Sequence, residues 1–251
     1  MHEIFNMTWQ QLILIFLVVT VAYVVFGMVG FGTALIATPV LAIFIPVSKI
    51  VPLLALMDMI AALNNILRDG RKADVDELKR LIPLMMVGSL IGSAILLKSR
   101  PDILLLGLGI FVVASSLYSL SGLSPKKKFQ PRAAIPFGII GGVFSALFGS
   151  GGFIYAIYLS GRIEKNENLR MTQTTLIGIS TLTRVILFGL AGIYGDVHLL
   201  MLTLILAPAM LCGVLIGRHI TIRLTREQFI RLINVVTLFS GLFLISHYIN
   251  G

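Results

Sequence analysis

Charged residues are scarce in this chain. Only 12% of its 251 residues are Asp, Glu, Lys or Arg, whereas soluble domains carry about one-quarter. Hydrophobic residues make up 57%, and the mean hydropathy is +0.98. The polar gaps between the apolar runs are too short to hold a soluble domain, so the sequence excludes a water-soluble fold.

Cysteine and histidine are also rare. The single cysteine, Cys212, lies within an apolar run and rules out a disulfide within the chain. The four histidines are scattered with no pair at metal-ligand spacing, so we expect no metal site and no cofactor. The first eleven residues lack a basic stretch, and no small-residue cleavage pattern follows, so we interpret them as mature protein rather than as a signal peptide.

Basic residues outnumber acidic ones, which gives the chain a formal net charge of +9. The basic residues lie in the short loops between apolar runs, as expected for loops kept on the cytoplasmic face of a membrane. They therefore indicate membrane orientation, and we expect no nucleic acid partner.

What the chain does contain is a series of apolar runs, each about as long as the 18 or so residues that cross a bilayer. They cover residues 12–45, 51–67, 81–97, 103–123, 133–159, 172–194, 197–216 and 229–249. The sequence thus predicts an all-α integral membrane protein that crosses a membrane several times.

The chain also repeats itself at half its length. PLMMVGSLIG at residues 83–92 matches PAMLCGVLIG at 208–217, and the first and fifth runs are both interrupted by glycines, in GMVGFGT and FGSGGF. We therefore expect two homologous halves of four helical units, residues 1–123 and 133–251, joined by a basic linker at 124–132. Each half would open with a glycine-broken helix, either re-entrant or discontinuous.

The basic loops indicate how the halves are oriented. If both glycine-broken units are re-entrant hairpins and the other six units cross, 16 of the 20 basic residues fall on one face. If all eight units cross, the basic residues divide almost evenly. The positive-inside bias favours the first arrangement, which makes the halves inverted repeats, a common transporter architecture, and places both termini away from the cytoplasm.

The glycine breaks are the first candidates for a binding site. A break at membrane depth frees backbone groups that lipid cannot satisfy, so it persists only against protein or a watery cavity. Where a helix restarts, at Thr33 or Phe153, its free N–H groups suit an anion, and Thr33 and Ser150 would add hydroxyl donors. The alternative is that these glycines only let helices pack closely.

Two charged residues lie deep within apolar runs. Arg184 is near the middle of the sixth unit, where an unpaired cation costs at least about 2.5–3.5 kcal/mol, and Asp58 lies in the second unit. In one interpretation they form a structural ion pair. In the other, Arg184 binds a substrate anion and Asp58 acts as a proton-coupling or gating acid.

Neighbouring polar residues extend this set. Asn65 shares a helical face with Asp58, Ser180 shares one with Arg184, and Thr175 belongs to a polar cluster at 172–175 behind the second glycine break. Capping of a helix end is the alternative for Asn65 and for the 172–175 cluster. Asp58 is expected to couple or gate, and the residues expected to bind substrate are Gly30, Phe31, Gly32, Thr33, Gly149, Ser150, Gly151, Gly152, Arg184, Asn65 and Thr175.

Together these motifs resemble the sulfite exporter TauE/SafE family of membrane transporters. The resemblance covers essentially the full length and depends on the order of GMVGFGTALIATPVL, FGSGGFIYAIYLS, the basic-then-threonine start of the sixth unit, and the repeat. It implies outward transport of sulfite, a sulfonate or another small organosulfur anion across a bacterial cytoplasmic membrane, with residues 30–33 and 149–152 framing the substrate. The sixth unit reads TQTTLIGIST where a threonine-serine pair is expected, which bears on the substrate more than on the fold.

The sequence therefore predicts a secondary transporter working by alternating access, and not an enzyme; it contains no P-loop for ATP hydrolysis. Proton coupling through Asp58 and uncoupled export are both consistent with it. An anion channel of the same architecture is the main alternative. A serine hydrolase would use Ser150, but Phe148 stands where an intramembrane serine protease requires glycine. The small residues at 88–89 and 92–93 suit a homodimer contact or packing within the chain.

Overall fold

The computed structural model of the chain describes residues 8–29, 32–69, 73–121 and 129–219, together with 235, 237–239, 241–246 and 248. For residues 63–69, 166, 167, 170, 218 and 219 the description covers the backbone only. In this described part the chain forms helices and no strand, which confirms the all-α prediction.

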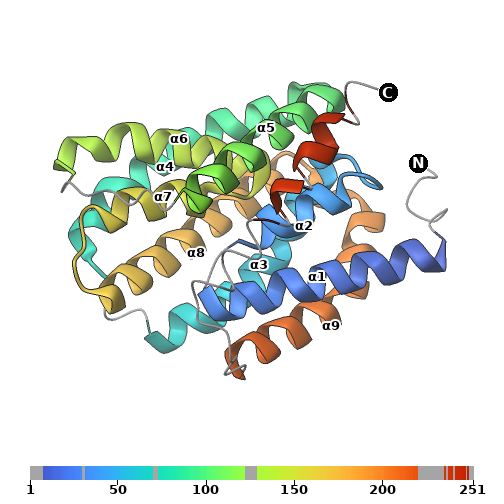
Figure 1. Cartoon of the computed structure of the whole chain (residues 1–251), viewed down its shortest axis with the longest axis horizontal. Helices are drawn as coiled ribbons and strands as arrows, with labels where there is room; N and C mark the ends of the chain where they lie inside the picture. Colours follow the sequence, from blue (N-terminus) through green and yellow to red (C-terminus); the bar gives the residue numbers. More distant parts are fainter. Residues whose placement is uncertain are drawn as a thin grey trace.

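The helices follow the predicted apolar units, and the first and fifth units contain two helices each (Figure 1). Their bounds are α1 (Trp9–Val29), α2 (Thr33–Leu41), α3 (Val47–Asp69), α4 (Val75–Lys98), α5 (Pro101–Leu120), η2 (Pro131–Ala133), α6 (Ala134–Phe148), α7 (Gly151–Ser160), α8 (Asn166–Leu190), η3 (Ile193–Gly195) and α9 (Val197–His219). The described residues of the eighth unit, 237–239 and 241–246, are also helical.

Short sequence signals fix where helices begin. The Asp74 carboxylate accepts the backbone N–H groups of Asp76 and Glu77 and so caps the start of α4. Pro101 is the first residue of α5, where its missing N–H is not needed. Both residues lie where a polar segment meets an apolar run, so these membrane-crossing helices begin at the edge of the apolar run.

Six of the described segments are long and apolar enough to cross a membrane: Trp9–Met28, Val75–Lys98, Pro101–Leu120, Pro131–Phe148, Met171–Leu190 and Val197–Gly217. Large apolar side chains such as Leu204 and Leu190 are exposed on the outside, where lipid is the solvent. The protein is therefore a multi-pass membrane protein. Two of the six, α1 and the η2–α6 segment, belong to the units expected to be re-entrant. They are long enough to cross because each apolar run continues for a full membrane thickness before its glycines.

Each glycine-broken unit folds as a long helix followed by a short one. α1 is followed by the nine-residue α2, and α6 by the ten-residue α7. Figure 1 shows α2 beside α1 and α7 beside α6, and both pairs are in contact. The Phe129 N–H donates to the Gly161 carbonyl at 3.0 Å, so the chain leaves α7 close to where it entered α6.

The long helix of each hairpin packs on a helix of the opposite half. α1 packs along α9, and α6 along α4. Both contacts depend on glycine, since a Cβ on Gly217 would meet the Val24 carbonyl and a Cβ on Gly88 would meet the Ile139 carbonyl. Close backbone approach of this kind joins helices in membranes. Gly88 and Gly217 both belong to the repeated ten-residue segment, so one repeated sequence makes both contacts.

The packing of α4 on α6 also decides the role of the small residues at 88–89 and 92–93. Gly88, Ser89, Gly92 and Ser93 are all buried, and Ser89 Oγ donates to the Gly142 carbonyl of α6 at 3.4 Å. They serve packing within the chain and therefore do not support a homodimer.

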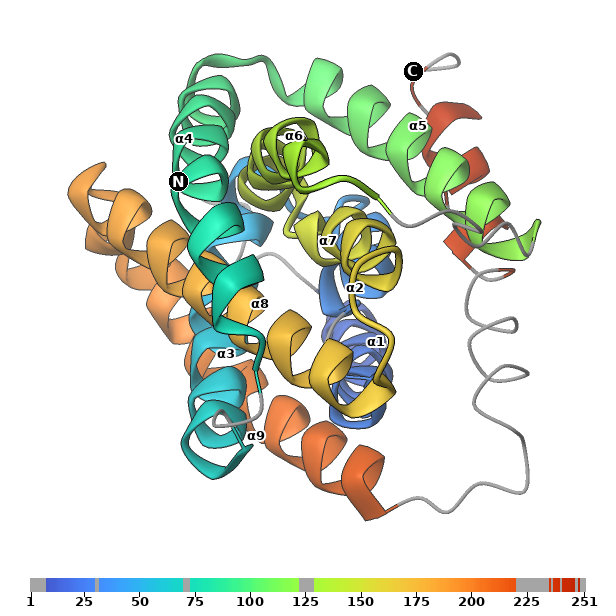
Figure 2. The ribbon, with the colours of Figure 1, turned by 90° about the vertical axis from the view of Figure 1, so that its left-hand side faces the viewer.

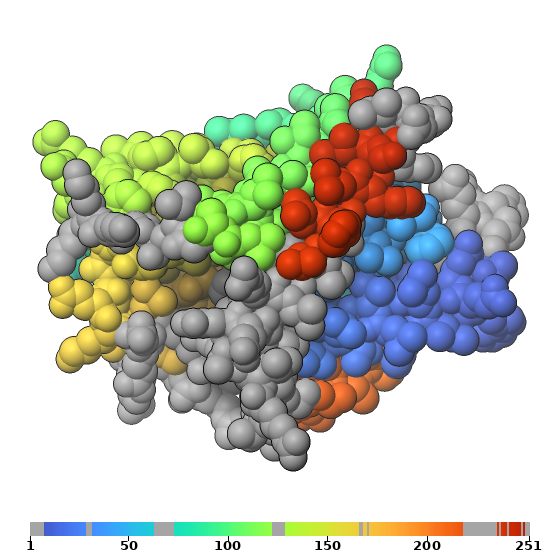
Figure 3. Space-filling model, in the orientation of Figure 1, coloured from blue at the N-terminus to red at the C-terminus, as the bar shows by residue number. Residues whose placement is uncertain are grey.

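Helices α3 and α8 contact each other in the middle of the molecule (Figure 2). α3 also packs on α9 and α8 on α4, so this central pair joins the two crossing pairs. The C-terminal segment packs on α5, where the Ser116 and Thr237 hydroxyls lie 3.0 Å apart; Figure 3 shows this segment in red at the surface beside α5.

Polar contacts that involve described loops are found at two opposite ends of the molecule. At one end Arg162 donates to the Phe129 carbonyl and to Glu77, which brings together three of the regions that the sequence placed on the basic face. At the other end, where α3 and α9 begin in Figure 1, Lys49 Nζ lies 3.3 Å from Asp196 Oδ2. The basic and less basic ends of the molecule are thus separated along its long axis.

Alanine at Gly88 or Gly217 forces a Cβ into the backbone of the neighbouring helix, so we expect each variant to lose about 1–3 kcal/mol of stability. Thermal unfolding of the detergent-solubilised protein measures this loss. Gly189→Ala is the control, because its Cβ would lie 3.8 Å from the Tyr194 ring and alanine favours helix. An equal loss in all three variants would contradict the close packing of the crossing pairs.

Candidate functional site

Asp58 of α3 and Arg184 of α8 meet where the two central helices cross. Arg184 Nη2 lies 4.0 Å from Asp58 Oδ2, and the two side chains are only 2% and 5% exposed. Isolated charges are costly at membrane depth, so each lowers the cost of burying the other. The pairing is loose, because a direct charge-assisted hydrogen bond is about 2.7–2.9 Å long.

The Asp58 carboxylate is held by two hydroxyls of the first half. Tyr23 of α1 donates to Oδ1 at 2.8 Å, and Thr33, the first residue of α2, lies 3.0 and 3.2 Å from the two carboxylate oxygens. The Thr33 hydroxyl, predicted to face substrate, is therefore bonded to Asp58 in this structure. The bond ties the start of α2 to α3.

The Arg184 guanidinium is bound less completely. Its Nη2 donates to Thr181 Oγ1 at 3.0 Å. Within the described part of the chain, Nε and Nη1 are buried and have no hydrogen-bond partner. A buried donor without a partner costs about 1–3 kcal/mol, and more when it is charged. Arg184 thus retains two nitrogens that can donate to an anion.

Two glycine turns lie beside this guanidinium. Gly32, before α2, has φ of 101° and Gly149, after α6, has φ of 69°, a left-handed conformation that other side chains disfavour. A Cβ on Gly149 would lie 2.7 Å from the Ala34 Cβ and 3.2 Å from Arg184 Nη1. Glycine at position 149 is needed both for the turn and for the close approach of the guanidinium.

A cavity of about 20 Å³ lies between the two turns. This volume holds about one water molecule. It is too small for an oxyanion of sulfur, so the site is closed in this conformation. Its lining comes from both halves: Phe26, Gly32, Thr33, Leu35, Asp58, Gly149, Ser150, Gly152, Phe153, Ile177 and Arg184.

The structure gathers seven of the twelve predicted site residues around this cavity: Gly32, Thr33, Asp58, Gly149, Ser150, Gly152 and Arg184. Gly151 packs behind the turn against Gly141 and Ser145, and Thr175 is half-buried on α8 away from the lining. Three predicted positions fall outside the described residues or side chains: Gly30, Phe31 and Asn65.

Sequence reasoning missed Tyr23 and Thr181, the hydroxyl partners of Asp58 and Arg184. Both left a signal, because Tyr23 is a polar residue within an apolar run and Thr181 lies one helical turn before Arg184. Ser180, which was expected to share a helical face with Arg184, lies 2.7 Å from the Ser145 hydroxyl of α6. The hydroxyl that accepts from Arg184 belongs to the next residue, Thr181.

Two expectations about helix ends are wrong. α7 restarts at Gly151 rather than at Phe153, since the turn is complete once Gly149 has reversed the chain. α8 begins at Asn166, so residues 172–175 lie inside the helix and do not cap it. Thr172 instead accepts the Asp74 N–H at 2.7 Å and so joins α8 to the start of α4.

Ser150 makes only a local bond in this structure. Its hydroxyl donates to the Phe148 carbonyl at 3.1 Å. The hydroxyl is thus oriented by its own turn, and its proton is directed toward a carbonyl rather than toward a base.

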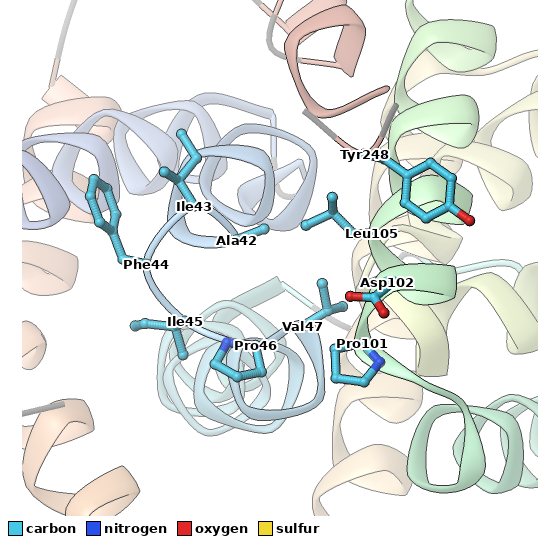
Figure 4. Close-up of a pocket in the computed structure, with 10 residues that line it drawn as sticks. All are labelled: Ala42, Ile43, Phe44, Ile45, Pro46, Val47, Pro101, Asp102, Leu105 and Tyr248. Carbon is cyan, nitrogen blue, oxygen red and sulfur yellow. The ribbon is translucent and has the colours of Figure 1, made fainter. Parts of the chain in front are cut away.

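A second, larger cavity of about 660 Å³ lies away from these residues (Figure 4). The loop residues 42–47 form one side, and Pro101, Asp102, Leu105 and Tyr248 form the other. Among the described residues of this lining, Asp102 is the charged one, and its negative charge disfavours an anion.

Comparison with known proteins identifies the family. The family described as "Sulfite exporter TauE/SafE" matches residues 15–244, nearly the whole chain. The chain belongs to the TauE/SafE family. The resemblance inferred from the motifs is thereby confirmed, and the matched TauE/SafE region contains both glycine turns, Asp58 and Arg184. No curated protein and no solved structure matches the chain.

The pairing of Asp58 with Arg184 can be tested by a double-mutant cycle. Asp58→Asn and Arg184→Gln each leave an unpaired buried charge, so each variant should lose about 3–5 kcal/mol of stability. The double variant should lose clearly less than the sum, because the two side chains interact. Thermal unfolding in detergent measures all three variants.

Asp102→Asn is the matched control for this cycle. It removes an exposed carboxylate from the first turn of α5 and should cost less than about 1 kcal/mol. Fully additive losses in the double variant would show that Asp58 and Arg184 do not interact.

Proposed function

We propose that this TauE/SafE protein is a secondary transporter of a small sulfur-containing oxyanion, such as sulfite or a sulfonate, and that Arg184 binds the negative charge of the substrate. One observation carries the proposal: within the described part of the chain, two buried nitrogens of Arg184 lack hydrogen-bond partners, and they lie beside a cavity lined by both glycine turns. The family description supports sulfite as the substrate and export as the direction.

The chemistry of the site suits an oxyanion. A guanidinium presents N–H groups in a planar fork that matches two oxygens of one anion. α2 starts at Thr33, which lines the cavity, and α7 starts at Gly151, between the lining residues Ser150 and Gly152, so two helix N-termini add partial positive charge. One full charge and two helix ends thus converge on the same small volume.

Asp58 is the proposed coupling residue. Its carboxylate reduces the cost of the buried Arg184 charge while the site is empty, but it repels an incoming anion. Protonation of Asp58 removes this repulsion, so a proton and the anion would favour each other's binding. This gives a physical basis for proton coupling.

Helix contacts support an inverted repeat with halves at residues 1–123 and 133–251 and a linker at 124–132. Exchanging α1, α2, α3 and α4 for α6, α7, α8 and α9 converts the contact of α1 with α9 into that of α6 with α4. The same exchange converts α3 on α9 into α8 on α4, and it returns the α3–α8 contact to itself. Asp58 and Arg184 would then lie near the axis that relates the halves, where alternating access exposes a site to each side in turn.

The closed cavity favours a carrier over a channel. An open channel needs a continuous path, whereas the site here has room for one water. Substrate binding must therefore be accompanied by movement of the glycine turns or of the helices that carry them. Saturable transport and exchange of substrate across the membrane are expected of a carrier.

Transport is tested with liposomes that contain the purified protein and are loaded with sulfite. Release should saturate with sulfite concentration and fall about 10–100-fold in Arg184→Ala, since one charged hydrogen-bonding group contributes about 1.5–3 kcal/mol. If Asp58 couples protons, an imposed pH gradient should drive release in the native protein and not in Asp58→Asn.

Arg100→Ala is the matched control, because it removes an exposed arginine at the start of α5. It should transport as the native protein does. Equal release from Arg184→Ala and native protein would rule out Arg184 as the anion-binding residue. Release no faster than from empty liposomes would reject sulfite, and sulfonates would be tested next.

The proposed orientation places the Glu77 and Arg162 end in the cytoplasm and both termini outside. Green fluorescent protein, which fluoresces only when it folds in the cytoplasm, should be dark at the C-terminus and bright when inserted in the linker at 124–132. Alkaline phosphatase fusions should give the reverse pattern. A fluorescent C-terminal fusion would contradict this orientation.

A further inference from the structure

The far end of α7 is held by a group of polar side chains around a buried glutamate. Glu77 of α4 is 3% exposed. Its carboxylate accepts from Arg162 Nη2 at 2.6 Å and Nε at 2.9 Å, from the Tyr158 hydroxyl at 2.7 Å and from Arg80 Nη1 at 2.7 Å. We name Glu77, Arg80, Tyr158 and Arg162 the Glu77 cluster.

The Glu77 cluster ties α7 to α4. Tyr158 lies near the end of α7, and Arg162 follows this end and also donates to the Phe129 carbonyl at 3.0 Å. The hydrogen bonds that Arg162 donates to the Glu77 carboxylate raise the pKa of Arg162, so the guanidinium stays charged. Moving α7 away from α4 would take Tyr158 and Arg162 from the buried Glu77 carboxylate and leave it with Arg80 of its own helix, which is unfavourable.

The near end of α7 is the proposed substrate site. α7 begins at Gly151, two residues after Gly149, on which a Cβ would lie 3.2 Å from Arg184 Nη1. A helix of ten residues is about 15 Å long. α7 is thus a short rigid connection between the Glu77 cluster and the Arg184 guanidinium.

Among the residues that the structure describes, the equivalent helix of the first half, α2, has no such attachment at its far end. Its sequence, TALIATPVL, contains no charged residue, and the loop that follows it lines the 660 Å³ cavity (Figure 4). The ion pair nearest in sequence, Lys49 with Asp196, joins α3 to the residue before α9 and does not involve α2. The two short helices therefore differ in how firmly their far ends are held.

The Lys49–Asp196 pair is itself a weak tie. Its side chains are 42% and 32% exposed, and exposed pairs contribute little to stability. Burial alone would raise the pKa of Asp196, but the His198 N–H and the Lys49 ammonium outweigh it and hold the pKa below its ordinary value. Asp196 is therefore charged at neutral pH, yet the pair has far less protection from water than the Glu77 cluster.

We propose that α7 is the inner gate of the transporter, that the Glu77 cluster is the latch that holds this gate closed, and that α2, which has no latch, is the gate that opens more readily. This rests on the proposed transport function. The empty protein then keeps its cytoplasmic side closed, and release of the latch limits how fast substrate loads from that side.

Accessibility of the site to a thiol reagent tests the latch without any substrate. Cys212 is the only cysteine, so Cys212→Ser gives a cysteine-free background, and Ser150→Cys then places one thiol at the start of α7. A membrane-impermeant methanethiosulfonate is added to inside-out and to right-side-out vesicles. With Glu77→Gln, labelling from the cytoplasmic side should become at least about tenfold faster, and labelling from the outside should not change.

Partner variants separate the latch from a general loss of packing. Arg162→Met should also speed cytoplasmic labelling, and the Glu77→Gln/Arg162→Met double variant should be no faster than the faster single variant, because both changes break one latch. Asp196→Asn, which breaks the ion pair at the opposite end, is the matched control and should leave cytoplasmic labelling unchanged.

Unchanged cytoplasmic labelling in a folded Glu77→Gln protein would overturn the proposal, and so would an equal increase from both sides. If Glu77→Gln does not fold, Tyr158→Phe removes one bond of the latch without changing any charge. It should speed cytoplasmic labelling by a smaller factor, and no change would again overturn the proposal. A failure of sulfite transport with this labelling pattern intact would count against the substrate alone.

Discussion

The loose ion pair between Arg184 and Asp58, at the crossing of α3 and α8, is the constraint on which the rest of the structure depends. The two side chains differ in how completely they are hydrogen-bonded. Asp58 receives the Tyr23 and Thr33 hydroxyls, whereas the described surroundings of Arg184 offer one hydroxyl and leave two nitrogens without partners. In a medium where lipid cannot supply the missing bonds, this inequality leaves an electropositive point at the centre of the protein.

Glycine determines how the surrounding helices reach this point. At Gly149 and Gly32 it permits the left-handed turns that end one helix and begin another beside the guanidinium. At Gly88 and Gly217 it lets backbones touch, which fixes the long helices firmly to the opposite half. A single residue type thus produces both the close packing of the long helices and the turns that start the short ones.

Much of this arrangement could be predicted from the sequence. The apolar runs predicted the helices. The glycine breaks, Arg184 and Asp58 predicted where the cavity lies, because broken helices and charges at membrane depth need polar partners. Contacts across the chain could not be read in this way. Nothing in the sequence says that Thr181 rather than Ser180 meets Arg184, since one position along a helix turns a side chain by about 100° and only the packing selects between them. The start of α8 at Asn166 was also missed, because the apolar run begins one and a half turns later than the helix.

Each long helix packs on a helix of the opposite half, and this packing affects how the protein folds during synthesis. α1 is synthesised first, yet the helix on which it packs, α9, is among the last to leave the ribosome, and the face of α1 around Gly27 that will meet Gly217 stays uncovered until then. Neither half can complete its packing alone, so the protein cannot fold half by half during synthesis in the way that multidomain proteins commonly do. Insertion into the bilayer and acquisition of the final structure are therefore separate events, and the nascent chain depends on the insertion machinery or on lipid to shield its unpaired helices in the interval.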